Sequence, residues 1–286
     1  MITNRKKYTQ PYQAPSVSSN QEMVFSRHSS CPAPKPSSYF RYKIYLGRFC
    51  AVLLLIPGLP IIAILVLLTK LTSSGPGIFK QVRVGKDGKL FVMYKIRTMV
   101  LDAEKNTGAV WASKSDPRIT GLGKILRKLH LDEFPQLINV VKGDMTLVGP
   151  RPERPEFVSI LDREIDGYTN RLKVPPGVTG FAQLNLPADE VIADVRRKIA
   201  LDFEYIEQAS VCFDFLLVLA TLGRAMKFSG FVPLKMLNVY RNVKDSSWAK
   251  HVGAIPGSER GALVSLDQLF EKANLDRLEK INTSIR

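Results

Sequence analysis

The sequence predicts an α-dominated α+β protein that associates with a membrane through one apolar segment. An uncharged, strongly apolar run occupies residues 49–69, and it is about long enough to span a bilayer as a helix. Apolar residues recur at helical spacing in 121–130, and 189–209 also has the character of a helix. Alternation typical of strands is confined to 78–99, so we expect a small β element. A chain of 286 residues can bury one substantial core or two smaller ones.

The charge of the chain favours an anionic partner, and its placement favours a membrane. The formal net charge is +15, and residues 1–48 hold eight Lys and Arg side chains against the single acidic residue Glu22. Basic residues beside an apolar segment are typical of contact with anionic lipid headgroups. The alternative is a membrane-anchored basic nucleic-acid-binding or scaffold protein. The tail has few aromatic residues and no recognisable nucleic-acid motif, so we expect no nucleic-acid partner.

The N-terminal residues and the cysteines indicate a cytosol-facing protein. Residues 1–38 are rich in Ser, Pro, Gln and Lys and lack hydrophobic periodicity, which predicts a disordered basic tail. The apolar run begins too late for a signal peptide. Cys31, Cys50 and Cys212 are far apart and odd in number, so they form neither a disulfide framework nor a metal-ligand spacing. A reducing compartment fits this usage.

Three interpretations of the apolar run fit its residues. Pro57, Gly58 and Pro60 lie near its middle, and each proline removes a helix donor and favours a kink. Basic residues flank both ends, so the positive-inside rule gives no clear orientation. A helix–break–helix hairpin that enters and leaves the same leaflet satisfies both observations. A kinked transmembrane helix and a buried soluble helix are the alternatives.

The β element is expected directly after the membrane segment. Residues 78–85 and 90–99 read as two strands joined by a hairpin turn at 86–89. Lys95 and Arg97 share a face of the second strand because side chains alternate along a strand. A solvated strand face is the ordinary interpretation of such a pair.

A carboxylate pair follows the basic helix 121–130, which carries Arg127. Because Pro135 tolerates only a first-turn position, a second helix should start near Asp132, with Glu133 in its first turn. An isolated pair of this kind is most often an ordinary helix start. A helix N-terminus also attracts phosphate, however, and Mg²⁺ held by a carboxylate and substrate phosphates would reconcile the two kinds of anion.

Two stiff loops follow. Residues 148–153 cannot be helical through their prolines, so Pro150 lies in a segment that presents Arg151 from a fixed backbone, and a rigidly held guanidinium suits bidentate phosphate binding. Residues 172–183 form the second loop. The apolar run 213–222 is too short for a confident span and is expected at the interface or against the apolar segment.

Six motifs in order resemble one protein family. They are Arg83-Val-Gly-Lys-Asp-Gly, Tyr94-Lys-Ile-Arg-Thr-Met, Asp116-Pro-Arg-Ile-Thr, Leu126-Arg-Lys with Leu131-Asp-Glu-Phe-Pro-Gln, the run from Asn139 to Glu153, and Pro176-Gly-Val-Thr-Gly-Phe-Ala-Gln. Together they resemble the bacterial sugar transferases, the monotopic phosphoglycosyl transferases, over about residues 40–225. The order of the six is far more specific than any one motif.

The resemblance implies an activity and roles for named residues. The enzyme would move a sugar-1-phosphate from a nucleotide sugar, usually a UDP-sugar, to a membrane polyprenyl phosphate and release UMP. Asp132 would carry the covalent phosphosugar, Glu133 would assist as metal partner or base, and Mg²⁺ would be the cofactor, held by these two carboxylates. The implied substrate-binding residues are Lys95, Arg97, Arg127, Pro150 and Arg151.

The resemblance also implies a topology: a re-entrant membrane helix hairpin on a compact cytosolic catalytic domain, at the bacterial inner membrane. The expected divisions are a tail at 1–38, a hairpin at 39–70, a catalytic domain at 71–226 and a variable C-terminal extension at 227–286, with a short charged helix near 274–281. One departure is Ile56, where the family often has Ser before the proline. The sequence carries no signal for the sugar, the polyprenol or the oligomeric state.

Overall fold

The computed structural model describes residues 22–23, 25, 29–104, 116–225, 235, 237–254, 265–266 and 268–269. Helices dominate this part of the chain, as the sequence predicts. The α-helices are α1 (Phe40–Thr72), α2 (Gly121–Lys128), α3 (Gln136–Lys142), α4 (Pro155–Glu164), α5 (Phe181–Asn185), α6 (Ile192–Gln208) and α7 (Val211–Ala225). The strands are β1 (Ile78–Val84), β2 (Leu90–Ile96), β3 (Thr146–Val148) and β4 (Gly177–Thr179). Short 3₁₀ turns are η1 (Lys86–Gly88), η2 (Leu131–Glu133), η3 (Tyr168–Lys173) and η4 (Val243–Asp245).

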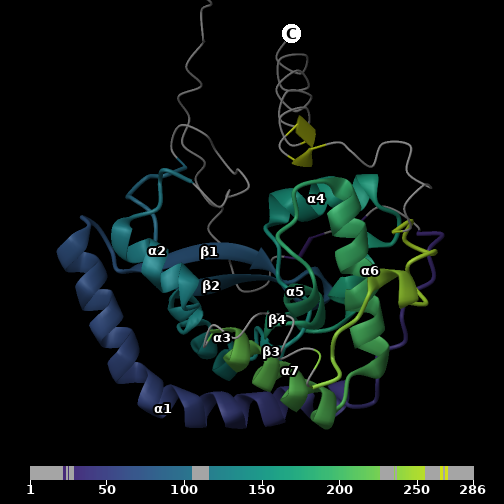
Figure 1. Ribbon diagram of the computed structural model, residues 1–286, viewed down its shortest axis with the longest axis horizontal. Helices are drawn as coiled ribbons and strands as arrows, with labels where there is room; N and C mark the ends of the chain where they lie inside the picture. Colours follow the sequence, from purple (N-terminus) through teal and green to yellow (C-terminus); the bar gives the residue numbers. More distant parts are fainter. Residues whose placement is uncertain are drawn as a thin grey trace, which may run out of the picture.

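Helix α1 follows the base and one side of the domain (Figure 1). Its first half packs on the domain through Ala51, which joins a cluster with Val140 of α3. Its second half packs through Ile62 and Leu65 against Ile96 at the end of β2. The opposite face of α1 exposes large apolar side chains along nearly its whole length. Both halves of the helix therefore rest on the same domain, and the outer face remains apolar.

The break expected near the middle of the apolar run is absent from the helix assignment. Helix α1 is continuous through Pro57 and Pro60, where the hairpin interpretation expects two helices. Both prolines lie on the exposed face and Gly58 faces the domain, so the helix curves around the domain without ending. A curve of this kind needs only the loss of the hydrogen bonds that the prolines cannot donate.

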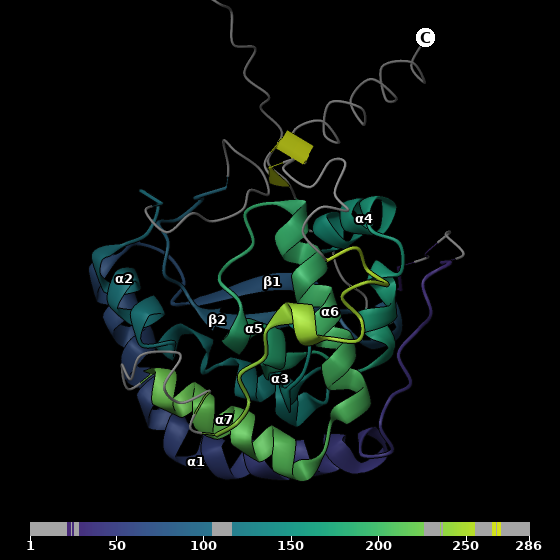
Figure 2. The same cartoon turned by 45° about the vertical axis from the view of Figure 1, so that its right-hand side comes forward.

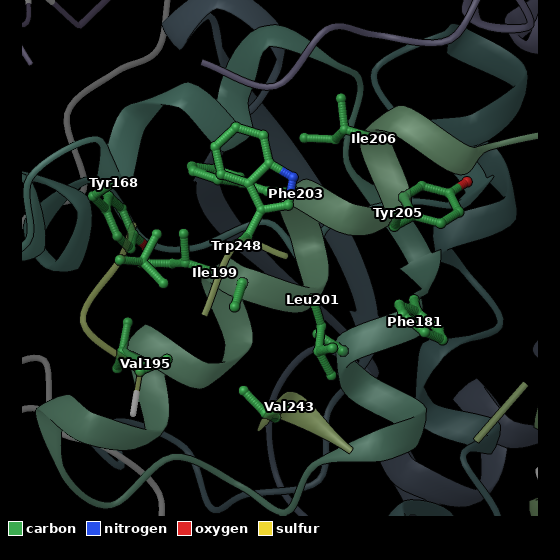
Figure 3. Packing of buried hydrophobic residues seen from close by; sticks show 14 of the residues in the cluster. Tyr168, Phe181, Val195, Ile199, Leu201, Phe203, Tyr205, Ile206, Val243 and Trp248 are labelled. Carbon is green, nitrogen blue, oxygen red and sulfur yellow. The ribbon is translucent and has the colours of Figure 1, made fainter. Parts of the chain in front are cut away.

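Helix α6 forms the centre of the main hydrophobic core (Figure 3). Its buried apolar side chains include Ile199, Leu201, Phe203, Tyr205 and Ile206. The ring of Trp248, from the C-terminal segment 237–254, meets the Phe203 ring edge to face at 5.2 Å between centroids. Residues outside the expected catalytic domain 71–226 thus complete its core.

Two small sheets carry the loops of the site. Strands β1 and β2 pair antiparallel from Ile78 opposite Ile96 to Val84 opposite Leu90, close to the predicted hairpin. Strands β3 and β4 pair in parallel and were not predicted, because each has only three residues; β3 leads into the stiff loop 148–153 and β4 lies inside the stiff loop 172–183. The backbones of Gly149 and Gly177 are in direct contact where these strands meet. A Cβ atom on either glycine would overlap backbone atoms of the facing segment. Glycine is therefore required for this close approach.

Segments near both ends of the chain pack on the domain. Residues 29–38, which the sequence assigns to the tail, place Cys31 in the main core. The backbone N–H of Leu266, which follows the C-terminal segment 237–254, donates to the carbonyl of Glu190 at 3.2 Å, in the loop before α6. Helix α7 lies beside α1 (Figure 2), and the Lys43–Asp214 ion pair of 2.5 Å joins the two. The predicted helix near 274–281 and most of 1–28 lie outside the described residues.

Candidate active site

The carboxylate pair lies on a 3₁₀ turn of its own. His130 adopts a left-handed conformation with φ of 55°, which ends the run of α2 and turns the chain. Turn η2 then holds Asp132 and Glu133, and α3 begins at Gln136 with Pro135 at its N-cap. The expectation that the helix starts near Asp132 is therefore wrong by about one turn. The fixed φ of Pro135 suits the helix cap, so the pair precedes the helix and does not form its first turn.

Glu133 is held by two cations from distant parts of the chain. Its Oε1 lies 2.8 Å from Nζ of Lys95 on β2 and 3.0 Å from Nη2 of Arg151 in the loop after β3. Burial disfavours the charged carboxylate, but Lys95 and Arg151 outweigh it and hold the pKa of Glu133 well below its ordinary value. The same contact raises the pKa of Arg151, so this pair stays ionised across the working pH range.

Asp132 has the opposite environment. Its side chain is 7% exposed, and no hydrogen bond or ion pair joins its carboxylate to a described residue. Burial raises the pKa of Asp132; Lys95 opposes that shift, Glu133 adds to it, and Arg127 and Arg151 oppose it. The turn therefore presents one carboxylate neutralised by partners and, next to it, one whose oxygens are not engaged.

The remaining predicted cations divide into two groups. Lys95 pairs directly with Glu133, and Arg127, whose Nε donates to Oγ1 of Thr98 at 2.8 Å, contributes its charge to the field at Asp132, as Lys95 does. Arg97 pairs with neither carboxylate among the described residues and donates from Nη2 to the carbonyl of Ser73 at 2.8 Å, just beyond α1. Strand β2 ends at Ile96, so the alternation that placed Lys95 and Arg97 on one face no longer applies there.

The loop that carries Arg151 is fixed through its backbone. The carbonyl of Pro150 accepts from the N–H of Gly177 at 2.9 Å, a contact outside the register of the β3–β4 pairing that joins the loop to the start of β4. The carbonyl of Arg151 accepts from Nη2 of Arg171 at 3.0 Å, and Asp202 of α6 binds the same guanidinium at 2.7 Å. The rigidity predicted from the two prolines is thus reinforced by buried charged side chains.

Several buried charges near this loop were missed by the sequence analysis. Nη1 of Arg83 donates to the carbonyl of Pro152 at 3.1 Å and lies 3.5 Å from Oε2 of Glu153. Nζ of Lys198 lies 2.8 Å from Oε1 of Glu153 and 2.8 Å from Oδ2 of Asp189. Although burial acts in the other direction, Lys198 and Arg83 lower the pKa of Glu153 to about 2. The available signal was the position of Lys198 beside the apolar residues of the helical run.

The two carboxylates fit a magnesium ion that substrate phosphates also bind. Among the described residues there is no group of three or more His, Cys, Asp and Glu side chains placed to hold a metal. Mg²⁺ usually needs only one or two carboxylates, since waters and substrate phosphates complete its shell. The oxygens of Asp132 are not engaged, and both ion pairs of Glu133 use Oε1. Asp132 and Glu133 together are therefore a donor set of the right chemistry.

Comparison with known proteins places the chain among enzymes of one class. The family model described as bacterial sugar transferase matches residues 38–228. A Bacillus subtilis (strain 168) protein is 48% identical over 145 residues, covering 51% of this chain and 80% of the relative, and has a provisional name as an undecaprenyl-phosphate N-acetylgalactosaminyl 1-phosphate transferase. The UDP-N-acetylgalactosamine-undecaprenyl-phosphate N-acetylgalactosaminephosphotransferase of Aeromonas hydrophila is 42% identical over 62% of this chain.

A third relative is the UDP-glucose:undecaprenyl-phosphate glucose-1-phosphate transferase of Escherichia coli (strain K12), 39% identical over 64% of this chain. The match covers 43% of the Aeromonas protein and 38% of the E. coli protein, so these relatives contain long regions that this chain does not match. Residues 38–228, which the family model matches, hold the carboxylate turn, the Arg151 loop and the whole of α1. On the evidence of the family model, which matches well over half of its residues, the chain belongs to the bacterial sugar transferase family.

Proposed function

We propose that this protein transfers a sugar-1-phosphate from a UDP-sugar to a polyprenyl phosphate in the membrane and releases UMP. The observation that carries the proposal is the Asp132 carboxylate, buried and not engaged, beside cations that would neutralise phosphate. The names of the relatives, which are transferases of this kind, support it. Their sugars differ, so the proposal extends to the UDP-sugar class and to no single sugar.

In the first step an Asp132 oxygen forms a bond to the β-phosphorus of the UDP-sugar. The bond from that phosphorus to the oxygen shared with the α-phosphate breaks, and UMP leaves with this oxygen. The sugar phosphate stays on Asp132 as an acyl phosphate. Lys95, Arg127 and Arg151 favour the ionised nucleophile and stabilise the charge that develops on the phosphoryl oxygens.

In the second step an oxygen of the polyprenyl phosphate bonds to the same phosphorus, and the bond to Asp132 breaks. The product is a polyprenyl diphosphate sugar, and the carboxylate is regenerated. Mg²⁺ bound by Asp132, Glu133 and phosphate oxygens would neutralise charge on the transferred group. Glu133 is a poor general base because its pKa is depressed by Lys95 and Arg151, so its role is to hold these cations and the metal.

We also propose that α1 is re-entrant, with both ends on the cytosolic face of the bacterial inner membrane. Among the described residues, α1 is the helix long and apolar enough to cross a bilayer. A straight span would separate its ends by the bilayer thickness, about 30 Å, and would leave one end far from the domain. Ala51 near the start of the apolar run 49–69 and Leu65 near its end both pack on the domain, which favours entry and exit on one side.

The covalent step is tested by the variant Asp132→Asn. With Mg²⁺, polyprenyl phosphate and a panel of UDP-sugars, the wild type should release UMP with at least one donor, and the variant should not. Intact-protein mass spectrometry of wild type with donor alone should show an added sugar phosphate that the variant lacks. Asp162→Asn, a half-buried carboxylate of α4 away from the turn, is the matched control. Turnover by Asp132→Asn at the wild-type rate would refute the assignment.

The topology is tested by cysteine labelling. Ser38 and Ser74 flank α1 and are exposed, so each is replaced by Cys in a chain whose three native cysteines are Ala. In sealed inside-out vesicles a membrane-impermeant maleimide should label both positions. Labelling of one position only, with the other reached after detergent, would establish a transmembrane span instead.

A further inference from the structure

We propose that Lys198 is a positioning residue for the transfer reaction, acting through the backbone that carries Arg151. The inference rests on the proposed function and extends it to the layer of residues behind the site. Lys198 lies on α6, and no hydrogen bond or ion pair among the described residues joins it to Asp132 or Glu133. Its influence must therefore travel through its partners.

Lys198 is the cation between two buried carboxylates. Its side chain is 11% exposed, and its Nζ lies 2.8 Å from a carboxylate oxygen of both Glu153 and Asp189, each of them buried. Burial disfavours the ammonium, but the two carboxylates outweigh it and raise the pKa of Lys198 above its ordinary value. Such a group is held in one place, because every alternative position leaves a buried charge without a partner.

Glu153 transmits this restraint to Arg151. Only Pro152 separates the two residues, and its ring fixes φ, so little freedom lies between them. The segment is held again where Arg83 binds the carbonyl of Pro152 and where the Glu153 carbonyl accepts from the N–H of Val84 at 3.0 Å. A shift of Glu153 would therefore move Arg151 relative to the carboxylates.

The far end of the network is also fixed. Asp189 lies in the loop between α5 and α6. The carbonyl of the next residue, Glu190, accepts from the N–H of Leu266, beyond the C-terminal segment 237–254, at 3.2 Å. Lys198 thus ties the Arg151 loop to a second loop and, beyond it, to residues outside the family match. Arg151 is aimed at Glu133 by groups that never meet the substrate.

The test removes Lys198 without leaving a net buried charge. In Lys198→Met/Asp189→Leu one cation and one anion are lost, and Glu153 keeps Arg83 as its partner. We expect kcat to fall by about 10- to 100-fold, since a misplacement near 1 Å can cost about 10²-fold, while KM for the UDP-sugar changes much less. Lys198→Arg should recover most of the rate. Arg197→Met, the half-exposed neighbour that pairs with Asp194, should leave kcat unchanged.

A double-mutant cycle separates positioning from a general structural role. In an Arg151→Lys background, which has lost the aimed guanidinium, the Lys198 change should add little further loss. Losses that multiply in that background, or a wild-type kcat for the Met/Leu variant, would overturn the proposal. Asp189→Asn changes a carboxylate into an amide of the same shape and is a milder perturbation of the same network. We expect it, too, to add little further loss of kcat in the Arg151→Lys background. Absence of UMP release by the wild type would instead refute the proposed function itself.

Discussion

Asp132 occupies a position where its own ionisation opposes folding. The carboxylate is buried and has no hydrogen-bond partner among the described residues, and its pKa is raised by burial. At neutral pH the folded protein must hold this charge out of water, whereas the unfolded chain exposes it. Burial of the Asp132 carboxylate without a hydrogen-bond partner thus accounts both for its reactivity and for its destabilising effect on the folded protein.

The first residue-scale prediction follows from the sign of that shift. Asp132→Asn removes the buried charge and keeps its shape, so its thermal unfolding temperature in detergent should exceed that of the wild type at pH 7. The difference in unfolding temperature between the variant and the wild type should shrink as pH falls through the raised pKa of Asp132. It should vanish below 3.8, the pKa of an Asp in the unfolded chain. Scanning fluorimetry across pH measures this, with Asp162→Asn as control. A lower unfolding temperature for Asp132→Asn would contradict it.

The second residue-scale prediction concerns the pH dependence of kcat/KM. Because Asp132 must be ionised to attack, kcat/KM should fall at low pH. The midpoint of this acidic limb should lie above pH 3.8, the ordinary pKa of an Asp, since the pKa of Asp132 is raised. Arg127 lowers the pKa of Asp132, so Arg127→Gln should move the limb to higher pH. The neighbouring exposed Lys128 provides the control Lys128→Gln, which should leave the limb in place. An unmoved limb in Arg127→Gln would exclude this electrostatic role.

How far single residues could be predicted depended on their chemistry. The roles of Asp132 and Glu133 came from the family resemblance, because an isolated carboxylate pair is most often an ordinary helix start, and the ion pairs of Lys95 and Arg151 with Glu133 agree with that interpretation. Arg97 was grouped with Lys95 by strand alternation, yet the strand ends before it. The helical run could indicate that Lys198 lies beside apolar residues, but it could not predict the pairing of Lys198 with Glu153 and Asp189, because a helical pattern does not show which buried charges will meet.

At the scale of elements, the close contact between β3 and β4 is the point most sensitive to change. Gly177→Ala would place a Cβ atom against the backbone of Gly149, so the two strands must separate and displace the Pro150–Arg151 loop. We expect a loss of about 1–3 kcal/mol in the free energy of unfolding, typical of overpacking, and a loss of transfer activity. Gly121→Ala, where a Cβ meets open space at the start of α2, should be tolerated. Chemical denaturation measures both, and equal effects would contradict the prediction.

Elements with a strong pattern were predicted well, and short ones were not. The β1–β2 hairpin, α2 and α6 follow runs of seven or more residues whose periodicity carries the signal. Strands β3 and β4 have three residues each, too few for a period, and exist because two glycines allow their backbones to meet. Proline content predicted stiff loops at these positions but gave no sign of the pairing between β3 and β4.

At the scale of the whole molecule, the C-terminal segment 237–254 is a structural part of the domain. Trp248 is 8% exposed, packs on Phe203 and donates from Nε1 to Glu207 at 3.0 Å. Trp248→Ala should lower the free energy of unfolding by about 3–5 kcal/mol, as for other buried aromatic residues. Lys250→Ala, an exposed neighbour, should have no measurable effect. Equal urea midpoints for the two variants would show that the segment is dispensable.

The packing of Trp248 on α6 also sets an order of events during synthesis. Helix α1 leaves the ribosome first, and Trp248 follows about 180 residues later, which takes roughly 10–35 s at bacterial and eukaryotic translation rates. In the first part of that interval, until α3 is complete about 70 residues after the end of α1, the domain-facing residues of α1 have no α3 to pack against, while its apolar outer face is already complete. With α1 re-entrant as proposed, the lipid bilayer is the partner present at that time. The chain would then be anchored before it is folded, and Trp248 and the core residues that follow it would reach a domain already held at the membrane surface.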